Sequence, residues 1–148
     1  MDFGLLLLRL IVGGIFAVHG YPKLFGGPDK PVPSDLARHL GTGFVEAVQR
    51  GPQGFAGMLR NMGVPEPERM AYVVGAAEFF GGILLALGWF TRLACLALIT
   101  DMVVAITRVH WRNGLVAPGG YEFPLSLLAA CLGLFFTGPG KLSFDQER

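Results

Sequence analysis

Charged residues are scarce in this chain: Asp, Glu, Lys and Arg make up 16% of its 148 residues. The formal net charge of +1 at pH 7 argues against the strongly basic surface of a nucleic-acid-binding protein. Hydrophobic residues account for 52% of the chain, which is too much for an ordinary soluble domain of this length. We therefore expect a single-domain membrane protein that contacts lipids and no nucleic acid.

Cysteine and cofactor motifs are equally sparse. The two cysteines, Cys95 and Cys131, lie inside apolar segments and match no zinc or CxxC spacing, so we expect free thiols and no metal site. The sequence has no CxxCH, no iron–sulfur cysteine set and no GxGxxG after a strand. His19 and His110 are too few to hold a haem between them. No flavin, haem or iron–sulfur cofactor is expected.

Long apolar segments dominate what is present. Four of them, residues 3–20, 70–88, 90–111 and 121–138, are each about 18–22 residues long, enough to cross a hydrocarbon core of roughly 30 Å. Tyr and Trp stand near their ends, as at membrane interfaces. Residues 21–69 form a long connection that contains helical patterns, including an amphipathic one from Phe55 to Met62. That connection is either a structural lid or a loop that gates substrate.

The remaining connections are short, so neighbouring helices should run antiparallel. The predicted fold is an all-α membrane protein: an antiparallel four-helix transmembrane bundle with a long helix-containing loop between helices one and two. Small residues lie on one stripe of helix two, beside Glu78, and on one stripe of helix four, and such stripes let helices approach closely. The two stripes comprise Gly75 and Gly82, and Ser126, Ala129 and Gly133.

Three charged residues lie deep within the spans. Counted from the end of the bundle that holds both termini, Arg9 lies about 9 Å deep, Glu78 about 13 Å and Asp101 about 16 Å. A charge in mid-bilayer costs at least about 2.5–3.5 kcal/mol, so we expect Arg9, Glu78 and Asp101 to form a buried ion-pair network. The network either holds the helices in register or leaves one carboxyl with a raised pKa that carries a proton.

Titratable residues gather toward the opposite end of the spans. They are His19, Lys23, Arg108, His110, Arg112 and Glu122. Cations and imidazoles that donate hydrogen bonds, together with a carboxylate that accepts protons, could bind and protonate a polar ring at the membrane surface. Lys23 and Arg112 could instead extend to the lipid headgroups.

Five motifs occur in the order and spacing of the DoxX family of small four-helix membrane proteins, which the chain resembles over nearly its whole length. They are "HGYPKLFGG", "GAAEFFGGILLALGWFTRLA", "VHWRNG", "GGYEFPLSLLAA" and "GPGKLSFD". The resemblance implies a multi-pass protein of the bacterial inner membrane with a redox role. Relatives in that family include the quinone-reducing subunit of thiosulfate:quinone oxidoreductase and partners of superoxide dismutase and sulfurtransferase. The motifs carry over Lys23, Glu78, Arg92, His110, Glu122 and Asp145.

The expected function is therefore that of a membrane subunit of a quinone-linked oxidoreductase or oxidative-stress redox system. Glu78, His110 and Glu122 are the expected catalytic residues, and His19, Lys23 and Arg108 the expected ligands of a quinone or small redox substrate near one membrane face. A protein partner is expected, because the chain has no electron carrier of its own. Two alternatives stay open: a non-catalytic anchor or assembly subunit of a larger respiratory or redox complex, and a small-molecule or proton transporter.

Overall fold

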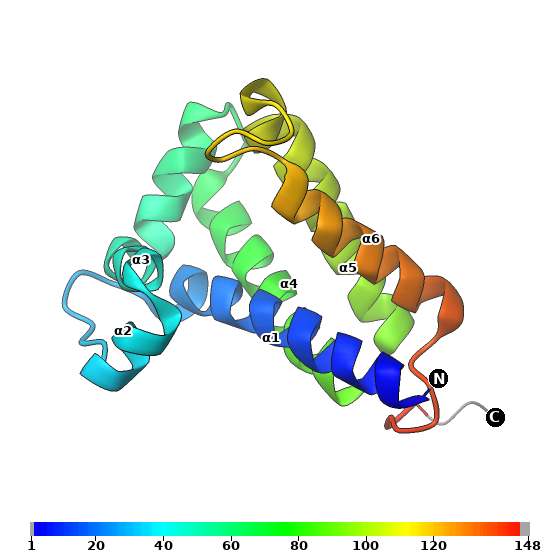
Figure 1. Cartoon of the computed structure of the whole chain (residues 1–148). Coiled ribbons are helices and arrows are strands. Elements are labelled where there is room, and N and C mark those ends of the chain that lie inside the picture. The colour runs from blue at the N-terminus through cyan, green and yellow to red at the C-terminus, as the bar shows by residue number, and fades with distance from the viewer. Residues whose placement is uncertain (1, 146–148) are drawn as a thin grey trace. The chain divides into compact units, whose positions relative to one another are not determined.

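The computed structural model describes residues 2–145, and within them the chain is helical and contains no strand (Figure 1). Six α-helices follow one another: α1 (Asp2–Phe25), α2 (Ser34–Leu40), α3 (Thr42–Asn61), α4 (Pro67–Leu87), α5 (Thr91–Val104) and α6 (Glu122–Thr137). After α5 the helix continues as a π-helical segment, η1 (Ala105–His110), and a 3-10 turn, η2 (Trp111–Asn113). The predicted all-α class is confirmed.

Within the described residues, three helical segments are long and apolar enough to cross a membrane: α1, α4 and the continuous helix Thr91–Asn113. α6 is apolar but has only 16 residues, or about 24 Å at 1.5 Å per residue. The membrane-spanning character of the first three predicted segments is thus supported by length and composition. A bundle of four spanning helices stays a prediction.

The first helix is longer than the sequence suggests. Gly20 and Pro22 are expected to end it, but α1 continues through Pro22 to Phe25, and the N–H of Gly26 still donates to the carbonyl of Pro22 at 3.0 Å. A proline removes one backbone hydrogen bond, a loss that membrane helices tolerate when their neighbours compensate. As a result Lys23 belongs to the helix and not to a loop.

The chain divides into two compact units, one formed by residues 2–15 and 81–145 and the other by residues 16–80. In the first unit α5 packs along α6, and Figure 1 shows the two helices side by side. Their contact buries Cys95 and Leu98 of α5 with Cys131 and Leu134 of α6. The stripe of Ser126, Ala129 and Gly133 is exposed, so the expectation that it packs against another helix is wrong.

The second unit combines the end of α1, helices α2 and α3, and the first half of α4. Gly20 lies so close to α4 that a Cβ there would collide with the backbone nitrogen of Phe79 and lie 2.8 Å from the carbonyl oxygen of Gly75. α3 bends at Gly51, whose backbone (φ 59°, ψ −165°) is one that only glycine adopts readily. Because Gly51 packs against the backbone of Gly26, the first part of α3 is fixed to the end of α1.

Candidate functional site

An ion pair between Lys23 of α1 and Glu78 of α4 forms the centre of the second unit. Nζ of Lys23 donates to Oε2 of Glu78 at 2.5 Å, and the two side chains are 20% and 6% exposed. Glycines make this pairing geometrically feasible: Gly20 brings the helices together, and a Cβ on Gly75 would stand 2.9 Å from Cβ of Lys23. A cation and an anion are therefore held together between two apolar helices.

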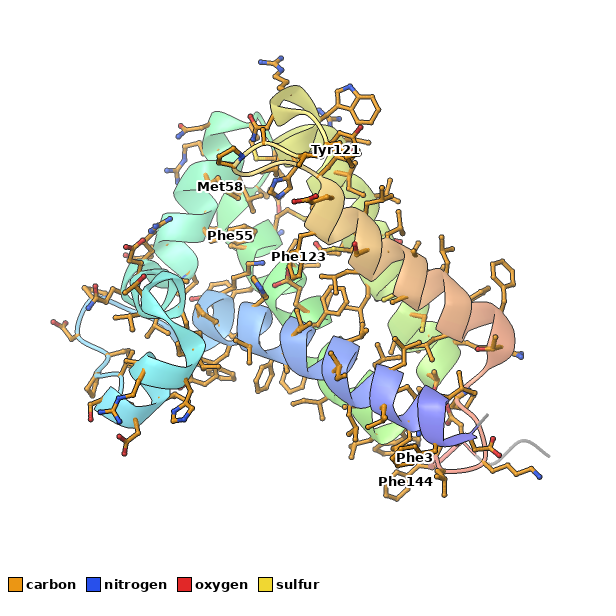
Figure 2. The ribbon with its side chains drawn as sticks, viewed as in Figure 1. Phe3, Phe55, Met58, Tyr121, Phe123 and Phe144 are labelled. Carbon is orange, nitrogen blue, oxygen red and sulfur yellow. The ribbon has the colours of Figure 1, made fainter. Side chains whose placement is uncertain are left out.

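The ring of Phe55 covers the ammonium of Lys23. The ring centroid lies 4.6 Å from Nζ, which is a cation–π contact. Figure 2 shows Phe55 on α3, with Met58 nearly one turn further along. The second part of α3 rests on α4 through a small cluster, which consists of Ala56, Leu59 and Ala71 with Phe55 and Val64 at its edge.

His19 completes the polar group of this unit. It lies one turn before Lys23 on α1, is exposed, and interacts electrostatically with both Glu78 and Lys23. Tyr21 follows, and its ring contacts the rings of Phe44 and Phe79, in each case with centroids 6.2 Å apart. The unit thus contains an ammonium, a carboxylate and an imidazole that interact electrostatically, and the ring of Phe55 lies against the ammonium. These groups can bind a polar oxygen and exchange a proton with it.

Glu78 pairs with Lys23 of its own unit, and the expected ion-pair network of Arg9, Glu78 and Asp101 stays a prediction. Arg9 is fully buried in the first unit, packs directly against Gly88 and donates from Nη2 to the carbonyl of Leu142. Helical side chains lean toward the N-terminus of their helix, so a long arginine reaches outward from the depth of its own Cα. Asp101 is half-buried on α5, and its place in an ion-pair network stays a prediction.

The C-terminal segment 138–145 holds the turn between α4 and α5. The carboxylate of Asp145 accepts the backbone N–H groups of Phe90 at 2.9 Å and Thr91 at 2.6 Å, so it caps the N-terminus of α5. Its own N–H donates to the carbonyl of Gly88 at 2.7 Å. Burial acts to raise the pKa of Asp145, but the bonds from Thr91 and Phe90 and the charge of Arg9 outweigh it and lower the pKa.

Asp145 therefore has a clear structural position. The sequence motif "GPGKLSFD" marks it only through family resemblance. No local pattern could identify it, because the helix that it caps begins 54 residues earlier.

The remaining expected site residues belong to the first unit. His110 lies at the end of the π-helical segment. Its Nδ1 forms a hydrogen bond with the carbonyl of Gly119 at 2.7 Å, and the same carbonyl accepts a hydrogen bond from the side chain of Asn113 at 2.9 Å. A carbonyl only accepts hydrogen bonds, so Nδ1 carries the proton, and Nε2 of the neutral ring is an acceptor. Three further expected or carried-over residues are exposed, namely Arg92, Arg108 and Glu122.

The structure thus brings together His19, Lys23 and Glu78 in one unit and attaches His110 to its own loop in the other. A single vestibule that joins both sets stays a prediction. The π-helical segment could not be anticipated, since nothing in its composition distinguishes it from α-helix. Such segments are frequent at functional sites.

Both cysteines are buried free thiols. Within residues 2–145 no group of three or more His, Cys, Asp or Glu side chains is arranged to hold a metal ion.

The sequence model of the DoxX family matches residues 4–111. The chain is 31% identical to CatD of Bacillus subtilis, whose name assigns it provisionally to the oxidoreductases, over 97% of this chain and 86% of that protein. It is 29% identical to the inner membrane protein YphA of Escherichia coli, over 99% of this chain and 95% of that protein. It is also 29% identical to the uncharacterized membrane protein Rv3486 of Mycobacterium tuberculosis, over 95% of this chain and 78% of that protein. No solved structure matches this chain. Together with the three apolar helices, these matches identify a multi-pass membrane protein that contacts lipid.

Proposed function

This chain belongs to the DoxX family, and from that premise we propose that it is the membrane subunit of a quinone-linked oxidoreductase in the bacterial inner membrane. Lys23, Glu78 and His19 bind the quinone headgroup near one membrane face. The observation that carries this proposal is the buried ion pair of Lys23 and Glu78. The names of CatD and YphA, which refer to an oxidoreductase and to the inner membrane, support the reaction class and the location.

The ion pair is difficult to explain by stability alone. Charged residues within membrane segments are costly and are usually functional. A buried ion pair is often no more stabilising than apolar residues of the same volume, because both ions lose their hydration. Two packed apolar helices have therefore no need of Lys23 and Glu78 for cohesion, which favours a role in binding or proton transfer.

The chemistry of the pair suits a quinone. An ammonium donates hydrogen bonds to a carbonyl oxygen, and the neighbouring carboxylate exchanges protons with the same site. Reduction of a quinone to a quinol consumes two electrons and two protons. The protons arrive through Glu78 and Lys23, and the two electrons come from a reduced sulfur compound or a reduced partner protein, which is oxidised. The partner is needed because the reaction requires an electron source.

His110 and Glu122 belong to the first unit, and we propose that they act on the protons of the quinol. With its Nδ1 proton held by Gly119, His110 presents Nε2 as an acceptor for a quinol hydroxyl. Glu122 begins α6 and is exposed, so it can pass protons to water. Replacement of either residue by alanine should reduce quinone retention while the protein stays folded in the membrane.

The test is purification in a mild detergent, followed by native mass spectrometry to detect bound quinone. Glu78→Gln should lose the quinone, because an amide cannot exchange the proton and binds the ammonium more weakly. Glu46→Gln is the matched control, since Glu46 also pairs with a cation, Arg50, but on an exposed surface. Retention of an obligate partner without any quinone, in the unmodified protein, would refute the proposal and favour the anchor subunit.

A further inference from the structure

We propose that Phe55 is a displaceable gate over Lys23, whose ring occupies the position that a planar carbonyl ligand takes on binding. The inference rests on the proposed function, because it assigns to the same site a ligand of quinoid type and a residue that controls its entry. It concerns the second unit alone.

The hydrogen bonding of Lys23 is the first step. An ammonium has three N–H donors, and Glu78 accepts a hydrogen bond from one of them. Phe55 offers the ammonium a π face at 4.6 Å. A charge-assisted hydrogen bond to oxygen is generally stronger than a cation–π contact with phenylalanine. Among the aromatic residues, tryptophan makes the strongest cation–π contacts and phenylalanine weaker ones. A carbonyl oxygen can therefore replace the Phe55 ring favourably.

Phe55 lies on a part of α3 that is held less firmly than the part before Gly51. Before Gly51, α3 is tied to α1: the N–H of Gly27 donates to the carbonyl of Val48 at 2.7 Å, and the backbones of Gly26 and Gly51 are in contact. After Gly51, the helix is held by a small apolar cluster around Ala56 and by an exposed ion pair. The bend at Gly51 lies between a fixed segment and a weakly held one, which is the arrangement of a hinge.

The weakness of the second segment can be judged from its contacts. Its ion pair between Arg60 and Glu68 joins side chains that are 62% and 64% exposed, and such surface pairs contribute little. The buried members of the cluster, Ala56, Leu59 and Ala71, include two alanines. Movement of Phe55 away from Lys23 would thus break few strong interactions.

The ligand class follows from what the gate replaces. The vacated position is that of a six-membered ring, and the ammonium beneath it requires an oxygen acceptor. A flat ring with a carbonyl group meets both conditions.

The first measurement is the affinity for decylubiquinone of the complete protein in proteoliposomes. Phe55→Leu keeps an apolar side chain but removes the π face, so the ligand no longer competes with the gate. Binding should become about 3- to 30-fold tighter, the range that corresponds to a lost cation–π contact. Met58→Leu is the matched control on the same segment, and it should leave the affinity unchanged. Unchanged or weaker binding by Phe55→Leu would overturn the proposal.

A second measurement does not require a quinone. Acetylation of lysines by an N-hydroxysuccinimide ester, followed by mass spectrometry, reports how accessible each ε-amine is. The exposed Lys30 and Lys141 serve as internal references. Relative to them, Lys23 should react several-fold faster in Phe55→Leu than in the unmodified protein or in Met58→Leu. Equal rates would show that Phe55 does not control access and would overturn the gate.

The two proposals fail in distinguishable ways. If no variant and not even the unmodified protein binds decylubiquinone, the proposed function is wrong and the quinoid ligand is wrong with it. If the unmodified protein binds and Glu78→Gln does not, but Phe55→Leu shows neither tighter binding nor faster labelling, only the gate is wrong. Faster labelling without tighter binding would also overturn the displacement of Phe55 by the ligand.

Discussion

The consequence of breaking the Lys23–Glu78 pair depends on what the substitution leaves behind. Glu78→Ala leaves a buried ammonium without its counter-charge, and losses of about 3–5 kcal/mol are typical in such cases. Because 20% of the Lys23 side chain is exposed, we expect a loss near the lower end, about 3 kcal/mol. Thermal unfolding of the detergent-solubilised protein, at one heating rate for all variants, measures the effect.

Three further variants separate charge from packing. Glu78→Gln keeps an acceptor oxygen and should cost clearly less than Glu78→Ala. The double variant Lys23→Met with Glu78→Leu removes both charges and should recover much of the lost stability. Glu46→Ala breaks an exposed pair and should cost less than about 1 kcal/mol. Equal losses for Glu78→Ala and Glu46→Ala would contradict a buried ion pair.

At the scale of the elements, the contact between α1 and α4 depends on glycine. In Gly20→Ala the new methyl group would collide with the backbone of α4 at Phe79, and a backbone cannot move aside as a flexible side chain can. We expect a loss of about 1–3 kcal/mol, as for other overpacked contacts, and lower accumulation in the membrane. Gly14→Ala is the matched control on the same helix, because a Cβ there meets nothing within 4 Å. If Gly14→Ala is as harmful as Gly20→Ala, close packing is not the cause.

The cap of α5 by Asp145 predicts a dependence on pH. Its folded-state pKa is lowered from the ordinary value of 3.8, so the stabilisation is complete above that value and is lost as the pH falls through the folded-state pKa. Asp145→Ala should cost about 0.5–2 kcal/mol, the usual range for loss of an N-cap. The difference in melting temperature between Asp145→Ala and the unmodified protein should be constant from about pH 6 to 8 and shrink only below about pH 4. A difference that already disappears near neutral pH would contradict this assignment.

The elements also show how far the sequence is informative. Apolar length alone locates α1, α4 and the helix Thr91–Asn113, because crossing a bilayer requires a fixed number of residues. The stripe of Gly75 and Gly82 correctly marks a packed face of α4, since both glycines are buried. The similar stripe on α6 fails, because small residues permit close contact but do not require it.

The site was harder to predict, for reasons that concern individual residues. The sequence patterns end the first helix near Pro22 and predict Lys23 either as a quinone ligand or as a residue that extends to the lipid headgroups. They do not indicate its ion pair with Glu78. Depth counted along Cα atoms favours Arg9 as the partner of Glu78, but it ignores the length and direction of the arginine side chain. Two of these contacts join residues far apart in the chain, Arg9 with Leu142 and Thr91 with Asp145, and no local pattern encodes them.

For the whole molecule, the predicted four-helix bundle depends on whether α6 crosses the membrane. The backbone N–H of Lys141 donates to the carboxylate of Asp2 at 3.1 Å, so the start of α1 and the segment after α6 lie on the same side of the bilayer. A chain that returns to its starting side must cross an even number of times. If α1, α4 and the helix Thr91–Asn113 each cross the membrane, they provide three crossings, and the predicted four-helix bundle requires α6 to provide the fourth. Its shortness can be accommodated by local thinning of the bilayer.

The number of crossings can be measured by labelling introduced cysteines from each side of the membrane. Lys30→Cys and Lys141→Cys each introduce a thiol at an exposed position, and α4, the helix Thr91–Asn113 and α6 separate the two positions along the chain. The native Cys95 and Cys131 are buried and should label slowly. With three crossings between them, positions 30 and 141 should react with a membrane-impermeant maleimide from opposite sides of oriented vesicles. Asp2→Cys, the control for the terminal side, should label together with Lys141→Cys. Labelling of positions 30 and 141 from the same side would mean that α6 lies within one face of the membrane, and the four-helix bundle would be wrong.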